Sequence, residues 1–121
     1  MPLPLIKNQY PGQEAAPGRI GALAADETGT IRAKSGIIDT VTHQSAGTYV
    51  VTTTEPLSGG PVDNPISGNV SYGTVNQPFI IHFYPVGAQQ IYVYTYSLIK
   101  GTWTLTDLRF TMEIGSAPPT V

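Results

Sequence analysis

The sequence predicts an all-β domain, either an antiparallel sandwich or a jelly-roll-like barrel, with an extended N-terminal arm. Val, Ile, Thr and Tyr are abundant in the 121 residues, and these residue types are enriched in strands. About eight short segments alternate apolar and polar residues, with turn signals spaced by roughly 8–12 residues. No segment repeats apolar residues at i, i+3, i+4 and i+7, as an amphipathic helix would. The length suits one domain.

The composition excludes several classes of partner. Only 12% of the residues are charged and the net charge is -2, so no basic patch is available for nucleic acid. The chain has no cysteine, which excludes a disulfide framework and a thiolate metal site. No apolar run approaches the roughly 20 residues that span a bilayer, and the N-terminus lacks the features of a signal peptide. We therefore expect neither nucleic acid nor a membrane as a partner.

Three regions are predicted along the chain. Residues 1–18, MPLPLIKNQYPGQEAAPG, contain four prolines and two glycines. Proline fixes its own φ and lacks the N–H that a helix or sheet uses, so this region is predicted to be an extended arm. Residues 19–115 are predicted to form a single β domain, and residues 116–121 a C-terminal tail.

The first half of the domain is predicted to hold four strands. RIGALAAD (19–26) places Ile20, Ala22 and Ala24 on one face, and TIRAKS (30–35) returns after the turn DETG. Asp26 is expected to cap this turn with its own side chain. IIDTVTH (37–43) and GTYVVTTT (47–54) follow, and residues 55–69 read as a long loop rich in Gly, Pro, Asn and Asp.

The second half is predicted to hold the strongest strands. A weak strand, NVSYGTV (69–75), precedes PFIIHFYP (78–85), whose bounding prolines do not fit the middle of a central strand. AQQIYVYTYSL (88–98) is the longest strand and IKGT is its turn. WTLTDLRFTMEI (103–114) closes the sheet, with one face formed by Leu108, Phe110, Met112 and Ile114.

No catalytic residue, cofactor or metal site is predicted. His82 lies on the same strand face as Ile80 and Tyr84, and we interpret it as a strand histidine bonded to backbone or solvent. Asp39 and His43 share a strand face without being adjacent, and a catalytic Ser or Thr would need a base and an orienting acid. A metal ion would need more converging ligands than these residues provide. The chain is therefore predicted not to be an enzyme.

The segment from Asn64 to Ile99 contains no Lys, Arg, Asp or Glu. Exposed uncharged strands aggregate, and natural proteins guard sheet edges with charge, so these strands are predicted to be covered or paired. Tyr92, Tyr94 and Tyr96 alternate with an aliphatic face that suits the core. The tyrosine side chains fit a subunit interface, a second core face with its hydroxyls at the rim, or a carbohydrate-binding face.

Trp103 is the only tryptophan. Its position in GTWTLT predicts a core residue next to Leu105. The alternative is a platform on which a sugar ring stacks.

Residues 35–57, SGIIDTVTHQSAGTYVVTTTEPL, resemble a recurring module of phage fibres and virion-surface proteins. The matching positions are Val41-Thr42-His43, Gly47-Thr48-Tyr49-Val50-Val51-Thr52 and Pro56-Leu57. LRFTMEI resembles the closing strand of such modules through Asp107, Phe110 and Met112, and residues 18–36 resemble the hairpin that precedes it. The resemblance extends over about residues 20–114.

This resemblance implies a trimeric β-structure on a virion that acts by binding. We accordingly expect a homotrimeric decoration or cement protein at the capsid surface, which stabilises the shell through its β domain and its arm. Tyr92, Tyr94 and Tyr96 are the expected subunit interface. Leu5, Ile6 and Tyr10 are the expected contacts of the arm with the major capsid protein. The alternatives are the receptor-binding tip of a phage fibre, with a host surface glycan as a possible ligand, and a carbohydrate-binding module.

Overall fold

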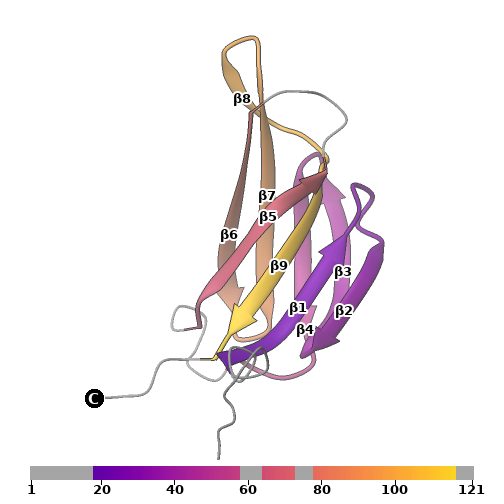
Figure 1. The fold of residues 1–121 in the computed structure, drawn as a ribbon, viewed down its shortest axis with the longest axis vertical. Helices are drawn as coiled ribbons and strands as arrows, with labels where there is room; N and C mark the ends of the chain where they lie inside the picture. The colour runs from indigo at the N-terminus through magenta and orange to yellow at the C-terminus, as the bar shows by residue number, and fades with distance from the viewer. Residues whose placement is uncertain (1–17, 58–63, 73–77, 117–121) are drawn as a thin grey trace, which may run out of the picture.

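Two antiparallel β-sheets pack face to face in the computed structural model, which describes residues 18–57, 64–72 and 78–116 (Figure 1). One sheet has the strand order β2-β1-β9-β5, and the other has the order β3-β4-β7-β6, with β8 also paired to β7. The described residues contain strands and turns but no α-helix. The predicted all-β sandwich is therefore confirmed. The predicted arm lies outside the described residues up to Pro17, as does the predicted tail after Ser116.

The nine described strands divide between the two sheets. The four-stranded sheet consists of β1 (Arg19–Ala25), β2 (Ile31–Gly36), β5 (Ile66–Tyr72) and β9 (Arg109–Gly115). The five-stranded sheet consists of β3 (Ile38–Ser45), β4 (Thr48–Thr53), β6 (Phe79–Gly87), β7 (Gln90–Ile99) and β8 (Thr102–Leu105). With 10 residues, β7 is the longest of them, as the sequence predicts.

Two predicted boundaries are wrong. β5 begins at Ile66, inside the predicted loop 55–69. The predicted closing strand 103–114 is two strands, because β8 pairs with β7 whereas β9 pairs with β1 and β5. The chain changes sheets at residues 106–108, where the N–H of Thr106 donates to the carbonyl of Thr95 at 2.9 Å. Apolar and polar residues therefore alternate along most of 103–114 even though the chain passes from one sheet to the other within this segment.

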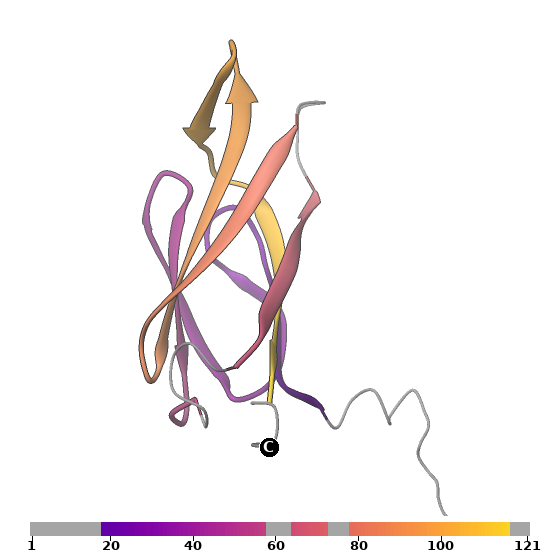
Figure 2. The same cartoon turned by 90° about the vertical axis from the view of Figure 1, so that its left-hand side faces the viewer.

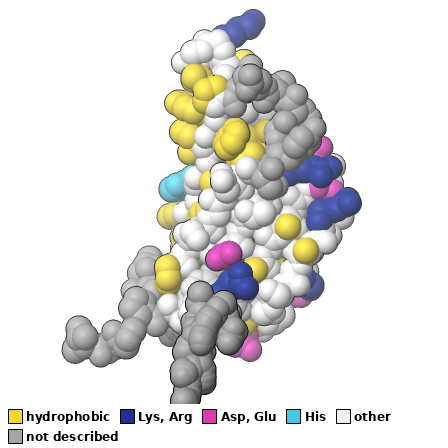
Figure 3. All heavy atoms as spheres, viewed as in Figure 1, with side chains coloured by type: hydrophobic (Ala, Val, Ile, Leu, Met, Phe, Trp, Pro, Cys, Tyr) yellow, Lys and Arg dark blue, Asp and Glu magenta, His cyan; other side chains and the backbone are white. Residues whose placement is uncertain are grey.

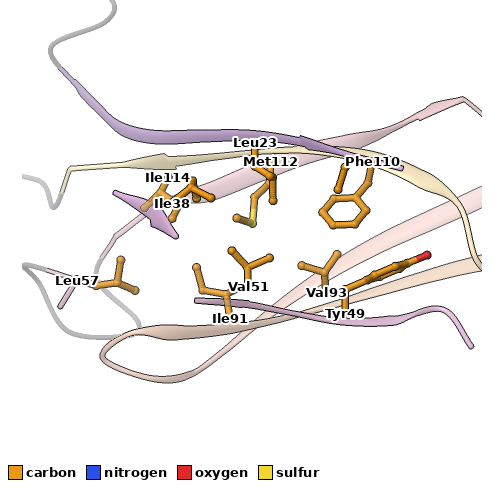
Figure 4. Close-up of a cluster of buried hydrophobic side chains, with 11 residues drawn as sticks. Leu23, Ile38, Tyr49, Val51, Leu57, Ile91, Val93, Phe110, Met112 and Ile114 are labelled. Carbon is orange, nitrogen blue, oxygen red and sulfur yellow. The ribbon is translucent and has the colours of Figure 1, made fainter. Parts of the chain in front are cut away.

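The core lies between the sheets and is filled from both sides (Figure 4). The predicted inward face of β9 is confirmed, because Leu108, Phe110, Met112 and Ile114 are all buried. In β1 the buried side chains are Leu23 and Ala25, on the face opposite to that of Ala22 and Ala24. The five-stranded sheet and its flanking loop contribute Ile38, Tyr49, Val51, Leu57, Ile91 and Val93.

The turn between β1 and β2 is held by Asp26, as predicted. Its Oδ1 accepts hydrogen bonds from the backbone N–H groups of Thr28 and Thr30, both at 3.0 Å, and from the Thr28 hydroxyl at 2.7 Å. The Thr28 hydroxyl and the two backbone N–H groups favour the charged carboxylate. Together with the nearby Arg32 guanidinium, they hold the pKa of Asp26 below its ordinary value of 3.8.

This lowered pKa predicts a loss of stability in acid. A carboxyl with a lowered pKa in the folded state stabilises the protein fully above its unfolded-state pKa, and this contribution disappears as the pH falls through the folded pKa. We expect the free energy of unfolding to decrease more between about pH 6 and pH 3 in the wild type than in Asp26→Asn, which cannot titrate there. Urea denaturation at both pH values measures the difference. Equal decreases in the two proteins would contradict this role of Asp26.

Candidate binding face on the five-stranded sheet

The three tyrosines of β7 point away from the core. Tyr92, Tyr94 and Tyr96 are half-buried, whereas the alternating residues Ile91, Val93, Thr95 and Ser97 are buried on the opposite face of the strand. The predicted division of this strand into a core face and a tyrosine face is therefore confirmed. The tyrosines lie on the outer surface of the two-layer sandwich, where no described strand covers them. Within the described residues, this position disfavours the interpretation as a second core face.

Strand pairing extends the row of tyrosines across neighbouring strands. In the register of β6 with β7, Tyr84 lies opposite Tyr92, His82 opposite Tyr94 and Ile80 opposite Tyr96. In the register of β7 with β8, Leu105 lies opposite Tyr96 and Trp103 opposite Leu98. We call this surface the tyrosine face, and its members are Ile80, His82, Tyr84, Tyr92, Tyr94, Tyr96, Leu98, Trp103 and Leu105.

The rings at the centre of the tyrosine face contact one another, and those at its margins are open to solvent. The ring centroids of His82 and Tyr94 are 6.0 Å apart with planes 26° from parallel, and those of Tyr92 and Tyr94 are 6.1 Å apart. Tyr84 is 56% exposed and Trp103 is 43% exposed. Ring contacts therefore fix the side chains at the centre of the tyrosine face. Large apolar side chains at its margins remain exposed.

The prediction that Trp103 belongs to the core is wrong. Trp103 and its neighbour Leu105 are both exposed, on the outer surface of β8. β8 pairs with the end of β7 that projects past the four-stranded sheet (Figures 1 and 2), so no described strand of the other sheet packs against β8. The tryptophan therefore enlarges the tyrosine face instead of filling the interior.

Charged side chains are absent from the tyrosine face and are concentrated on the other side of the sandwich. Three ion pairs are carried by the four-stranded sheet and its β1–β2 turn, namely Arg19 with Glu113, Arg109 with Glu27, and Arg32 with Asp26. Figure 3 views this side, where few hydrophobic atoms are visible except at the projecting end of β6, β7 and β8. The two outer surfaces therefore differ: one suits water and the other suits burial against a partner.

A shallow groove of about 610 Å³ lies on the outer surface of the four-stranded sheet. It is lined mainly by short side chains, including Ala22, Ala24, Ala33 and Ser67, with Lys34 and Glu113 also along it. Its lining offers no aromatic ring and no cluster of acids or histidines. The groove exists because the outward side chains of β1 are small, and its lining residues do not form a catalytic or metal-binding group.

A second cluster of polar groups joins the two sheets at the β3–β4 turn. Nε2 of His43 lies 2.9 Å from Oδ1 of Asp107, and the same oxygen accepts the backbone N–H of Gly47 at 2.7 Å. The His43 ring stacks on Tyr49 with centroids 5.0 Å apart, and the Tyr49 hydroxyl donates to the Glu27 carbonyl at 2.8 Å. His43 is thus paired with an acid 64 residues away, not with Asp39.

The geometry of this cluster is that of a structural junction. Gly47 has φ of 64°, and a Cβ at this position would lie 2.6 Å from the Thr95 carbonyl oxygen, so only glycine fits the turn. Asp107 fixes the turn by accepting its N–H, and His43 closes the side of the core next to Tyr49. Asp39 is used in a different contact, in which its backbone carbonyl accepts a hydrogen bond from Nζ of Lys34 at 3.1 Å. The contacts of Asp107 and His43 thus give both residues a structural role at the junction of the two sheets.

The described part of the chain offers no metal site and no helical membrane span. No group of three or more His, Asp or Glu side chains in residues 18–57, 64–72 and 78–116 could hold a metal ion. The same residues include no helix long and apolar enough to cross a membrane. The predicted arm contacts Leu5, Ile6 and Tyr10 lie outside the described residues. No protein-family model, curated protein or solved structure matches the chain.

Proposed function

We propose that this protein is a structural assembly module, a homotrimeric decoration or cement protein of a viral capsid, whose subunits associate through the tyrosine face. The observation that carries the assembly role is the uncharged aromatic surface formed by β6, β7 and β8. Tyr, Trp and other aromatic residues are enriched in protein interfaces, and charged residues are depleted from interface centres. An exposed apolar patch of this kind marks a site of interaction.

The physical chemistry of this surface favours a protein partner. Tyr and Trp rings bury a large area at a low cost in side-chain entropy, and their polar groups can keep a hydrogen bond in the interface. Ile80 and Leu105 lie opposite Tyr96 on its two sides, and Leu98 lies opposite Trp103. Such aliphatic side chains gain from burial against other apolar groups. The ring contacts of Tyr94 order the centre of the face before binding, which reduces the entropy lost on association.

The viral setting rests on the sequence. Residues 35–57 resemble a module of virion-surface proteins, and this resemblance supports a trimer and a location at the capsid surface. The major capsid protein is the partner that we propose for residues 1–18, including Leu5, Ile6 and Tyr10. A cement protein adds to the stability of a shell because it binds the assembled state and not the dissociated one.

A carbohydrate-binding face is the second candidate, favoured by the exposure of Trp103 and Tyr84. Exposed rings can stack on sugar rings. Sugar hydroxyls also need hydrogen-bond partners, because a buried polar group without one is costly. The tyrosine face offers tyrosine hydroxyls, His82 and the Trp103 N–H but no carboxylate or guanidinium. A fibre tip that binds a host glycan would use the same surface, so both variants predict glycan binding.

The mass of the protein in solution tests the proposed function. Sedimentation equilibrium at micromolar concentration is expected to give three times the 12.9 kDa mass of the chain. A glycan array on the same preparation is expected to give no signal. A stable monomer would contradict assembly through the tyrosine face, and a monomer that binds glycans would favour the second candidate.

A further inference from the structure

β6 is an edge strand, and among the described strands only β7 pairs with it. Its sequence, FIIHFYPVG, contains no Lys, Arg, Asp or Glu. An edge strand presents a row of unpaired N–H and C=O groups, and natural proteins guard such edges with charge, proline or a cover. Among the described residues, proline is the one of these guards that β6 has, with Pro78 before the strand and Pro85 near its end.

The hydrogen bonds to β7 determine which residues of β6 face the open edge. The N–H of Leu98 donates to the Pro78 carbonyl at 3.0 Å, and Ile80 and His82 continue this register opposite Tyr96 and Tyr94. In an antiparallel pair, alternate residues direct their backbone groups toward the partner strand. The backbone groups of Phe79, Ile81 and Phe83 therefore point away from β7, toward the open edge. Pro85 has the same parity, so its missing N–H costs no bond to β7.

Space for another strand lies beside this edge. A hollow of about 520 Å³ separates the lower part of β6 from the beginning of β5, and it is lined by Ile81, Phe83, Pro85 and residues 64–66. Figure 2 views this side of the molecule, with β6 and β5 in different layers. β5 belongs to the other sheet and does not pair with β6. Ile81 and Phe83, whose backbone groups point toward the open edge, both line this hollow.

We propose that β6 pairs with β6 of a second copy of this chain, antiparallel and about a two-fold axis at Ile81. This register places Phe79 opposite the partner's Phe83 and provides three hydrogen-bonded pairs, or about six backbone hydrogen bonds. It also covers Phe79, which is 44% exposed in the single chain. Cross-strand aromatic pairs stabilise a sheet.

A second copy fits this edge better than an unrelated strand. The antiparallel register about Ile81 is self-complementary. In each copy, Phe79, Ile81 and Phe83 donate their backbone N–H groups and accept through their backbone carbonyls. Both strands are uncharged, and the prolines at 78 and 85 confine the pairing to the segment between them. The pairing also continues the five-stranded sheet and its tyrosine face across the two-fold axis. The inference rests on the proposed assembly function and adds a two-fold contact that links trimers to one another.

Amide hydrogen exchange measured by NMR tests the edge directly. The amides of Ile80, His82 and Tyr84 bond to β7 and are expected to be protected at every concentration. The amides of Phe79, Ile81 and Phe83 are expected to gain protection by at least about tenfold as the concentration is raised into the range of association. If these three amides stay unprotected in the associated protein, or are equally protected in the monomer, the edge pairing is overturned.

A matched pair of variants tests the same contact by mass. Phe79→Pro removes the outward N–H and places a ring against the incoming strand, without removing a bond to β7. Phe79→Ala removes the same phenyl group but keeps the N–H. Phe79→Pro is expected to weaken two-fold association at least about tenfold relative to Phe79→Ala. Equal association of the two variants would overturn the proposal.

Tyr94→Ala separates this inference from the proposed function. Tyr94 points to the outer surface, so its truncation leaves the open edge intact. If the edge amides gain protection with concentration in Tyr94→Ala while trimers are lost, both proposals are supported. If trimers form in the wild type without protection of the edge amides, the edge inference fails and the proposed function stands. If protein dimerises through the edge but never forms trimers, the proposed function fails alone.

Discussion

Tyr94→Ala is expected to dissociate the trimer while each monomer stays folded. Tyr94 is at the centre of the tyrosine face, in ring contact with His82 and Tyr92. Truncating a central aromatic residue of an interface costs about 2–4 kcal/mol, and three symmetric copies are removed together. The inward residues Ile91, Val93 and Thr95 remain in place, so the core of the monomer keeps its packing. Sedimentation gives the mass, and circular dichroism reports the fold.

Two further variants serve as controls for Tyr94→Ala. Tyr94→Phe keeps the ring and loses only the hydroxyl, so its effect on association is expected to be about 1 kcal/mol. Thr111→Ala changes the outer surface of the opposite sheet and is expected to leave the mass unchanged. A fully assembled Tyr94→Ala trimer would refute the interface. Loss of assembly together with loss of fold would assign Tyr94 to the core, and loss of glycan binding alone would assign it to a sugar site.

The pattern of side chains along β7 and β9 could be predicted because it is local. Alternation of apolar and polar residues determines which side chains share a face of a strand, and the burial of Ile91, Val93, Phe110 and Met112 follows it. The absence of charge between Asn64 and Ile99 is likewise a property of the sequence. Residue order alone therefore indicates that the tyrosines of β7 share one uncharged face.

The extent of the tyrosine face could not be predicted, because it depends on strand pairing. His82 and Tyr84 join Tyr94 and Tyr92 only through the register of β6 with β7. Trp103 joins them because β8 folds back on the projecting end of β7. Alternation predicts that Trp103 and Leu105 share a face, but it does not reveal whether another layer covers that face.

The junction of His43 and Asp107 escaped prediction for a related reason. The two residues are 64 positions apart and meet because the connection from β8 to β9 passes the β3–β4 turn. The short-range pattern only placed Asp39 on the same strand face as His43 without making the two adjacent, and it named no partner for His43. One signal was available, since Gly47 in SAGT indicates a turn with positive φ, whose N–H groups need acceptors. The identity of the acceptor is a property of the tertiary fold.

Tyr49→Ala is expected to unfold the monomer or bring it close to unfolding. Tyr49 has no solvent exposure, and its ring centroid lies 5.1 Å from that of Phe110 and 5.0 Å from that of His43. Removing a buried aromatic side chain costs about 3–5 kcal/mol, which is a large part of the roughly 5–15 kcal/mol by which domains are stable. Urea denaturation followed by circular dichroism measures this loss.

Two comparisons identify the origin of the Tyr49 effect. Burial raises the pKa of the Tyr49 hydroxyl, and the nearby Asp107 carboxylate acts in the same direction, so the hydroxyl stays neutral and donates to the Glu27 carbonyl. Tyr49→Phe loses this hydrogen bond alone and is expected to cost about 1 kcal/mol. Trp103→Ala removes a larger but exposed ring and is expected to cost the monomer less than about 1 kcal/mol. If Trp103→Ala destabilised the monomer as much as Tyr49→Ala, the core would have to include β8, contrary to the exposure of that strand.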